Sequence, residues 1–166
     1  MKEIFERRSI RKYTNKKITD KELEELLKAA MAAPSAYNEQ PWEFIIVTDN
    51  KILESITKFH SNSQMLKEAA AAIIVCGNLT KEKVPGYWIQ DCSAATENIL
   101  IEARYLGIGS VWLGVYPTKE RVKGVKKLFN LPKKIIPFSI VSLGYPAEEK
   151  EPSKRYDESR IHTNMW

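Results

Sequence analysis

A run of residues near the start of the chain combines positive charge with a hydroxyl group. Arg7, Arg8 and Arg11 surround Ser9 in the segment Arg7-Arg8-Ser9-Ile10-Arg11-Lys12-Tyr13. Forked guanidinium donors beside a hydroxyl can hold a phosphate group through several charge-assisted hydrogen bonds. A solvated basic turn has the same composition, and the spacing alone does not separate the two interpretations. The segment is therefore a candidate phosphate site at the end of a short helix.

A second candidate region is the loop Pro34-Ser35-Ala36-Tyr37-Asn38-Glu39-Gln40-Pro41-Trp42. Loops carry function more often than core segments do, and this one concentrates amide groups, a hydroxyl group and aromatic rings. The other interpretation is a rigid connector whose Asn and Gln side chains bond the local backbone. Composition leaves both interpretations open.

A third candidate is the glycine-rich segment Gly107-Ile108-Gly109-Ser110-Val111-Trp112-Leu113-Gly114. It has the look of a phosphate-binding loop, but it follows a predicted helix and precedes a predicted strand. The dinucleotide fingerprint requires the reverse order of strand, turn and helix, so a Rossmann fold is rejected. Glycines without a side chain still allow the backbone to approach a flat ligand closely.

Sequence signals for the start and end of helices flank these candidate segments. Thr19-Asp20-Lys21-Glu22 is a capping box, in which the Thr hydroxyl and the Glu carboxylate satisfy exposed amides at a helix start. The helix should end before Pro34, because the residue preceding a proline avoids the helical region. Asp49 and Thr118 are each expected to cap a further helix, and the helix after Thr118 should stop before Pro132. Another helix is predicted over about residues 87–106.

Four short apolar runs predict strands, over residues 44–47, 71–76, 110–115 and 136–143. The run from Ala71 to Cys76 is apolar at every position, which is typical of a central strand buried on both faces. The resulting order α-α-β-α-β-α-β-α-β predicts a sheet covered by helices on both faces.

The predicted helix over residues 87–106 carries apolar residues on two sides. One stripe contains Trp88, Cys92, Ala95, Ile99 and Ala103, and a second contains Ile89, Thr96 and Leu100. A helix that is apolar on two sides is buried on two sides, either in a core or against another subunit.

Composition excludes several classes of protein. The excess of 26 Lys plus Arg over 21 Asp plus Glu permits an anionic ligand but does not demand nucleic acid. Two cysteines in apolar surroundings, Cys76 and Cys92, indicate reduced packing residues, and with His60 and His162 they are too few for a zinc site. No apolar run reaches the roughly 20 residues that cross a bilayer, and the first residues lack a secretory signal. We expect a cytoplasmic protein with no metal, no membrane partner and no nucleic-acid partner.

Taken together, the three candidate segments resemble the nitroreductase family of FMN-dependent oxidoreductases, in its short branch. The resemblance rests on Arg-Arg-Ser-x-Arg, on Pro-Ser-Ala-x-Asn-x-Gln-Pro-Trp and on Gly-x-Gly-Ser-x-Trp, and it extends to Gly144-Tyr145-Pro146 and Lys154-Arg155-Tyr156-Asp157. It implies an α+β fold, a three-layer α/β/α sandwich with a mixed or antiparallel central sheet, as an intertwined homodimer. Residues 1–166 would form one domain, with residues 148–166 docking on the partner subunit.

The resemblance also implies a set of residues that bind non-covalent FMN. Phosphate and ribityl contacts fall on Arg7, Arg8 and Ser9, a second phosphate clamp on Lys154 and Arg155, and the N1/O2 side of the flavin on Arg11. A fixed cation at N1 and O2 stabilises the reduced flavin.

The remaining implied contacts surround the flavin ring. The loop residues Pro34, Ser35, Ala36 and Asn38 would reach the ring from the partner subunit, Leu113 and Gly114 would lie at the N5 edge, and Asn62 and Gln64 would bond the ring edge. The large aromatic residues Trp42 and Trp112 are expected to pack in the core, and His60 and His162 are expected at the surface or in the core, with no acid–base role.

The implied reaction moves a hydride from NAD(P)H through the N5 atom of FMN to an aromatic or quinone-type acceptor, with ping-pong kinetics because one site serves both substrates in turn. Other flavin chemistry on the same fold, reductive dehalogenation or flavin cleavage, is an alternative. The short stretches 61–67 and 81–85 leave no elaborate lid and favour an open, promiscuous pocket. A basic nucleic-acid-binding module built on residues 7–17 is a further alternative, without any recognisable nucleic-acid motif.

Overall fold

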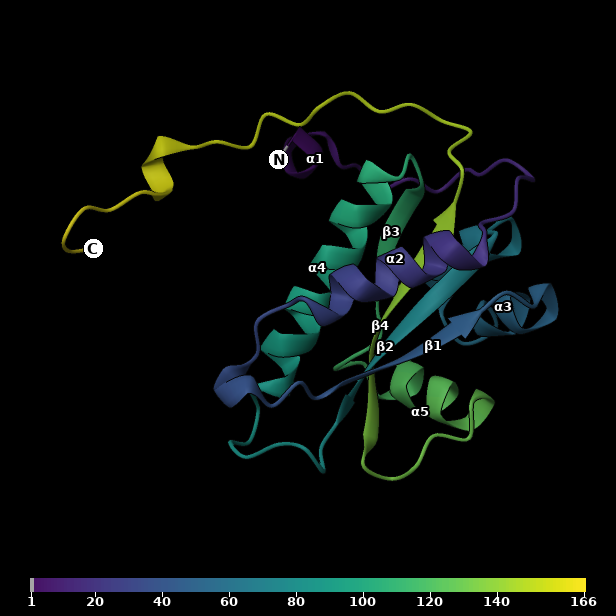
Figure 1. Cartoon of the computed structure of the whole chain (residues 1–166), viewed down its shortest axis with the longest axis horizontal. Helices are drawn as coiled ribbons and strands as arrows, with labels where there is room; N and C mark the ends of the chain where they lie inside the picture. Colours follow the sequence, from purple (N-terminus) through teal and green to yellow (C-terminus); the bar gives the residue numbers. More distant parts are fainter. Residues whose placement is uncertain (1) are drawn as a thin grey trace.

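Four antiparallel strands form the centre of the computed structural model, which describes residues 2–166 (Figure 1). The strands are β1 (Trp42–Val47), β2 (Ala71–Asn78), β3 (Gly109–Gly114) and β4 (Ile135–Gly144), in the spatial order β1-β2-β4-β3. All four predicted strands are confirmed. The two central strands, β2 and β4, are almost entirely buried because helices cover both faces of the sheet.

The described residues form five α-helices: α1 (Lys2–Glu6) and α2 (Asp20–Met31) precede β1, whereas α3 (Asn50–Ile56), α4 (Trp88–Tyr105) and α5 (Lys119–Leu128) lie between successive strands. They confirm the helices predicted from the sequence, including the end of α2 before Pro34. Three short 3₁₀ helices were not predicted: η1 (Ala36–Asn38), η2 (Ser61–Lys67) and η3 (Glu158–Arg160). Segments this short carry little apolar periodicity, so a pattern search passes over them.

The helix starts show which capping signals act. The Thr19 hydroxyl accepts from the Glu22 backbone N–H at 3.2 Å, and the Glu22 carboxylate accepts from the Thr19 N–H at 2.7 Å. Asp49 caps α3 by accepting from the N–H of Lys51. Thr118 does precede α5, but its side chain makes no capping bond, so that part of the prediction is wrong.

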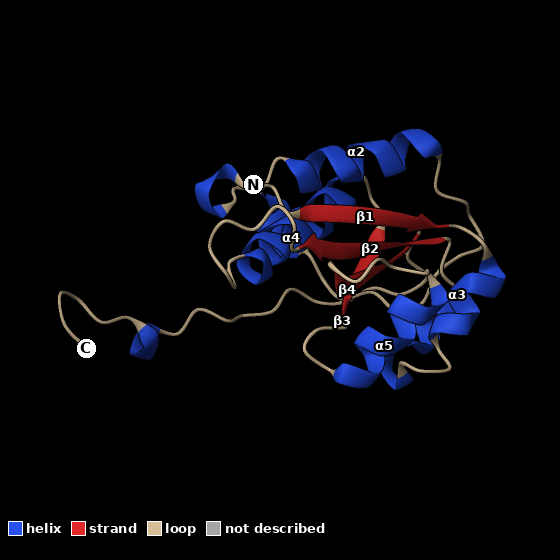
Figure 2. Ribbon diagram, turned by 90° about the horizontal axis from the view of Figure 1, so that it is seen from below, coloured by secondary structure: helices blue, strands red, loops and turns tan. Residues whose placement is uncertain are grey.

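The helices lie in two layers (Figure 2). Helices α2 and α4 pack on one face of the sheet, and α3, η2 and α5 pack on the other. Each face has its own apolar core, one of which includes Leu26, Ile73 and Ile99 and the other Leu53, Ile74 and Ile140. This is the α/β/α sandwich expected from the order of elements.

The two apolar sides of α4 are covered within this chain. Its first stripe and the Thr96 and Leu100 positions of its second stripe are buried, because α2 and the sheet both pack against it. The Asn98 amide also donates to the Ala29 carbonyl oxygen at 2.9 Å and so ties α4 to α2. The two-sided pattern therefore indicates burial in the core and does not by itself require a second subunit.

Both cysteines are free and buried, as predicted. Burial raises the pKa of the Cys76 thiol to about 12 and also raises the pKa of Cys92. Within residues 2–166, no helix combines the length and the apolar character needed to span a bilayer.

The C-terminal segment leaves the body of the molecule (Figure 1). Every residue from Glu151 to Trp166 is exposed, and the side chain of Trp166 is 100% exposed. The only ring contact of Trp166 in the described chain is with His162, at 4.2 Å between centroids. The segment therefore does not dock on the described part of its own chain.

Candidate active site

The N-terminal basic segment lies along the edge of the sheet formed by β3. Ile10 N–H donates to the Ser110 carbonyl oxygen at 3.0 Å, and Ser9 forms a parallel bridge with Ser110. The buried Tyr13 hydroxyl donates to the Ile10 carbonyl oxygen at 2.9 Å. Burial raises the pKa of Tyr13 to about 12, so this phenol stays neutral. These contacts hold in place the backbone from which Arg7, Arg8 and Arg11 project.

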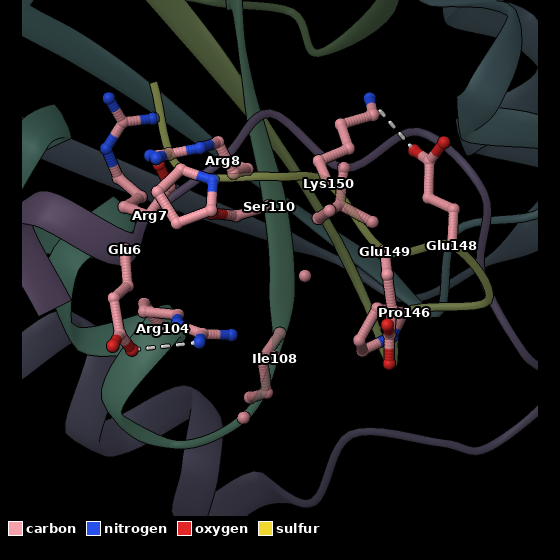
Figure 3. A pocket seen from close by; sticks show the side chains of 14 residues that line it. Glu6, Arg7, Arg8, Arg104, Ile108, Ser110, Pro146, Glu148, Glu149 and Lys150 are labelled. Atoms are coloured by element: carbon pink, nitrogen blue, oxygen red, sulfur yellow. Dashed lines mark hydrogen bonds and ion pairs between the residues drawn. The ribbon is translucent and has the colours of Figure 1, made fainter. Parts of the chain in front are cut away.

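A hollow of about 360 Å³ opens between this segment and the C-terminal end of α4 (Figure 3). Four cations and three carboxylates are among its lining residues: Arg7, Arg8, Arg104, Lys150, Glu6, Glu148 and Glu149. Arg7 and Arg8 line it together with Ser110 and Lys150. Arg8 Nε donates to the Glu151 carbonyl oxygen at 2.7 Å, whereas its buried Nη2 has no partner among the described residues. The Arg7 guanidinium forms an ion pair with Glu97 at 3.2 Å. The hollow thus holds at least one donor that its own chain leaves unsatisfied.

The start of the C-terminal segment closes one side of this hollow. Lys150 Nζ donates to the Ser9 carbonyl oxygen at 2.6 Å, and the Glu148 carboxylate accepts from the backbone N–H of Arg11 at 2.6 Å. The Arg11 N–H and the neighbouring Lys150 hold the pKa of Glu148 below its ordinary value of 4.5. Glu148 therefore remains an anion that fixes the Arg11 backbone.

A second hollow, of about 500 Å³, lies at the end of β3. It brings together five residues that the sequence analysis singled out: Arg11, Asn62, Gln64, Leu113 and Gly114. The volume falls within the roughly 300–1,000 Å³ of ligand pockets. His60, Met65 and Arg121 also line this hollow, and no Asp or Glu does so among the described residues. Its electrostatic character is positive.

Gly114 occupies a distinctive place in this second hollow. Its carbonyl oxygen accepts two hydrogen bonds, from His60 Nε2 at 2.9 Å and from Arg121 Nη1 at 2.8 Å. A Cβ atom built on Gly114 would meet no atom of the chain within 4 Å, and the backbone there is not left-handed. The fold itself does not require glycine here, so the open face is free for a flat ligand to approach the backbone.

His60 and Arg121 are site residues that sequence reasoning missed. His60 was expected at the surface or in the core, and it is 1% exposed. Burial, with a smaller contribution from Arg121, lowers the pKa of His60 from its ordinary value of 6.5, so the ring is neutral and donates through Nε2. Arg121 lies in a lysine-rich helix, and no local pattern distinguishes it from a solvated cation.

The loop after α2 lies apart from both hollows in this chain. Ala36 N–H donates to the buried Asp91 carboxylate at 3.0 Å, and the Ser35 hydroxyl accepts from Gln40 N–H at 3.0 Å. Tyr37, Asn38 and Gln40 all have left-handed backbone, with φ between 47° and 53°. Strained residues of this kind cluster at functional sites. The neighbouring Pro34, like the other loop residues, lines neither hollow.

The distance along α4 explains this separation. The loop bonds Asp91 in the first turn of α4, whereas Arg7 pairs with Glu97 near the middle of the helix and Arg104 pairs with Glu6 in its last turn. Eighteen helical residues span about 27 Å. Lys154 and Arg155 lie on the exposed C-terminal segment just beyond Pro152, which lines the first hollow, but they line neither hollow themselves. Ser9 does not line the first hollow; it forms the parallel bridge with Ser110, and its carbonyl oxygen accepts from Lys150 Nζ.

The fold is α+β, and the N-terminal basic segment lines two hollows beside the edge strand β3. The model of the Nitroreductase family matches residues 4–83 and 57–145. This chain belongs to the nitroreductase family.

Relatives agree with this assignment over the full chain. A protein of Archaeoglobus fulgidus named "Putative NADH dehydrogenase/NAD(P)H nitroreductase" is 52% identical over 100% of this chain and 98% of its own length. The crystal structure of a "Putative NADH Oxidase" from Clostridium acetobutylicum superposes with a TM-score of 0.96 at 45% identity, covering 99% of both chains. An "FMN-dependent Nitroreductase" from Clostridium difficile has a TM-score of 0.91 at 32% identity, covering 99% of this chain and 98% of that one.

Proposed function

We propose that this chain is an NAD(P)H-dependent flavin oxidoreductase that binds FMN non-covalently and reduces an aromatic or quinone-type acceptor. The observation that carries the proposal is the hollow at the end of β3, where Arg11 and Arg121 face an open backbone at Gly114 with no acidic residue among the described lining. The names of the similar proteins, which include FMN and NAD(P)H, support the same reading.

The residues present fit FMN. A phosphate requires several donors, and Arg8 Nη2 is a buried donor without a partner in the described chain. Arg7 lies beside it, and Ser9 fixes the local backbone. A flat ring requires a surface without side chains, and Gly114 provides one. The two hollows share the Arg7–Arg11 segment, which is how a phosphate and a ring of one ligand would be held by neighbouring residues.

FMN, when bound, supplies the chemistry, since it takes up a hydride from NAD(P)H and passes it to the acceptor. The chain supplies binding, orientation and charge. Arg11 would hold positive charge beside the ring, where it stabilises the negative charge that reduction creates. Asn62 and Gln64 would form hydrogen bonds to the edge of the ring. Leu113 and Gly114 would limit how deeply the ring enters the hollow. Because one slot serves donor and acceptor in turn, we expect ping-pong kinetics.

The remaining predicted residues are proposed to act across a homodimer. Pro34, Ser35, Ala36 and Asn38 would complete the ring site of the partner subunit, and Lys154 and Arg155 would complete a phosphate clamp there. Two observations support this: the loop has left-handed backbone at three positions and lines neither hollow, and the C-terminal segment is exposed throughout. An obligate interface of this kind buries upwards of roughly 2,000 Å².

Reconstitution with FMN tests the proposal. The purified protein is unfolded, refolded with excess FMN and titrated by flavin fluorescence. We expect one site per chain with micromolar affinity or better. Replacing Arg7 with Ala should weaken binding about tenfold to a hundredfold, because a hydrogen bond to a charged group contributes about 1.5–3 kcal/mol. Arg11→Ala should lower the reduction potential of the bound flavin more than its affinity.

The matched control is Lys28→Ala, which removes a cation that pairs with Glu24 and Glu25 on α2. This change should leave FMN affinity unaltered. Absence of FMN binding at micromolar concentration would overturn the proposed function.

A further inference from the structure

Two buried carboxylates, Glu39 and Asp91, have no role in the site described so far. Glu39 is 7% exposed and Asp91 is 4% exposed. Each is bonded through one oxygen, while its second oxygen, Glu39 Oε2 or Asp91 Oδ2, is buried without a partner among the described residues. A buried acceptor that lacks a donor costs stability, so acidic side chains at such positions call for an explanation.

Both carboxylates hold the loop of residues 34–40. The loop lies beside the start of α4 (Figure 1), where the Asp91 carboxylate accepts from the Ala36 N–H at 3.0 Å. Glu39 belongs to the loop itself, and its Oε1 atom accepts from the N–H of Lys83 at 2.7 Å and from the N–H of Val84 at 3.1 Å. The loop is thus tied to α4 at one point and to the segment before α4 at another.

Apolar packing does not hold this loop. Glu39 is the only buried residue among the described residues 34–40. Three residues of the loop have left-handed backbone, which costs free energy and persists only where the surroundings impose it. Within the loop, Gln40 donates from its backbone N–H to the Ser35 hydroxyl oxygen and from its side chain to Asn38 Oδ1, both at 3.0 Å. These bonds shape the loop, and the two carboxylates fix that shape to the body of the molecule.

We propose that Asp91 and Glu39 are positioning residues, which hold the loop of residues 34–40 in the shape and place from which it completes the flavin site of a partner subunit. The inference rests on the proposed function, because the loop lines neither hollow of its own chain. The two carboxylates act on the ligand through the loop backbone that they hold.

The chemistry of Asp91 separates this role from a general contribution to stability. Burial raises the pKa of Asp91 above its ordinary value of 3.8; the Ala36 N–H opposes this effect, and the Glu39 and Glu82 carboxylates add to it. Ionisation of Asp91 therefore weakens the fold. Asp91→Asn keeps an oxygen acceptor for the Ala36 N–H and removes the charge, so the melting temperature should hold or rise. Asp91→Ala removes the acceptor.

The first test measures the FMN affinity and the melting temperature of variants refolded with FMN. Asp91→Ala and Glu39→Ala should each weaken FMN binding about tenfold, as expected for the loss of one good contact, whereas Asp91→Asn should bind within about twofold of the wild type. The matched control is Asn98→Ala, which also removes a bond from an α4 side chain to a backbone group, the Ala29 carbonyl oxygen. It should lower the melting temperature and leave FMN affinity unaltered.

The second test uses mixed dimers of two differently tagged chains, one with Asp91→Ala and the other with Arg7→Ala. One flavin site of such a dimer combines both defects, whereas the other has an intact Arg7 and an intact loop. We expect one FMN site of wild-type affinity per mixed dimer. A purely structural role of Asp91 would instead weaken the site of the chain that carries Asp91→Ala. In the control dimer of Asp91→Ala with Glu39→Ala, each site meets one altered loop, so no tight site should form.

Three outcomes would overturn the inference: wild-type FMN affinity in Asp91→Ala, an equal loss of affinity in Asp91→Asn, or the absence of a tight site in the mixed dimer with Arg7→Ala. A flavin-loaded wild type that stays monomeric would overturn it as well, since no partner would then receive the loop. Failure of the proposed function has a separate signature, because the wild-type protein would then bind no FMN at micromolar concentration.

Discussion

The hollow at the end of β3 and the C-terminal segment that follows Glu151 are held in opposite ways. In the hollow, residues from four distant parts of the chain converge, and the Gly114 carbonyl oxygen alone accepts bonds from two of them, His60 and Arg121. In the segment 153–166, the hydrogen bonds and ion pairs of the described chain are all local, as between Arg160 and Asp157. The first region is assembled from distant segments of this chain, whereas the second makes only local contacts among the described residues.

This difference separates two kinds of predicted residue. Arg11, Leu113 and Gly114 are brought together by the parallel bridge between the N-terminal segment and β3, so one chain suffices to assemble them. Lys154 and Arg155 are cations like Arg11, but both are exposed and their side chains make no ion pair with the other described residues. A site that is half assembled in one chain and half exposed is what two interlocked copies would produce.

The largest expected effect comes from shortening the C-terminal segment. Truncation after Glu151 should abolish a stable dimer and weaken FMN binding about tenfold or more, because it removes the exposed apolar side chains and the two proposed clamp cations together. Truncation after Arg155 keeps the cations and should mainly weaken the dimer. Sedimentation and FMN titration measure the two effects. A flavin-loaded, active monomer near 19.1 kDa would contradict the shared site.

A smaller effect, confined to the hollow, is expected from Gly114→Val. The new side chain meets no atom of the chain, and a β-branched residue suits a strand, so the melting temperature should hold or rise. The same side chain would occupy the open face, and FMN affinity or turnover should fall by at least about tenfold if one good contact is lost.

The matched change is Gly77→Val in β2, where a side chain would overlap the indole ring of Trp88 in the core. Overpacking there should cost about 1–3 kcal/mol of unfolding free energy, with little direct effect on the hollow. Calorimetry and FMN titration of both variants should therefore give opposite profiles. Equal losses of stability would contradict the open-face interpretation of Gly114.

The elements of the fold that depend on short-range interactions could be predicted from the sequence. The capping box at Thr19, the helix end before Pro34 and the four apolar strands are short-range signals, and each appears in the structure. Two features depend on tertiary context and were missed. The apolar stripes of α4 did not separate burial in the core from a subunit contact, and α2 and the sheet pack against this helix within the chain, while the Thr118 hydroxyl does not cap α5.

In the candidate site, too, some residues could be predicted from local motifs and others depend on tertiary context. The family-like motifs identify Arg11, Leu113 and Gly114, and the fold brings these residues together. His60 and Arg121 could not be found, because a histidine between helices and an arginine among lysines acquire their roles only when Gly114 lies between them. In the proposed homodimer, the positions of Pro34 and Arg155 relative to a ligand would depend on a second chain.

The smallest predicted effect concerns the pH dependence of stability at His60. Its pKa in the folded protein is lowered from 6.5, mainly by burial, so the unfolded chain binds the proton more readily than the folded chain does. Stability from the neutral ring is therefore present above about pH 6.5 and is lost as the pH falls toward the folded pKa, with a slope of at most about 1.4 kcal/mol per pH unit.

His60→Gln keeps a donor for the Gly114 carbonyl oxygen and removes the titration. Relative to the wild type, this variant should gain stability between about pH 7 and pH 5 in chemical denaturation. His162→Gln, in the exposed C-terminal segment, is the control for loss of a histidine elsewhere. A difference between His60→Gln and wild type that stays constant over this range would show that His60 does not titrate with a lowered pKa, and the fixed, neutral donor at Gly114 would have to be abandoned.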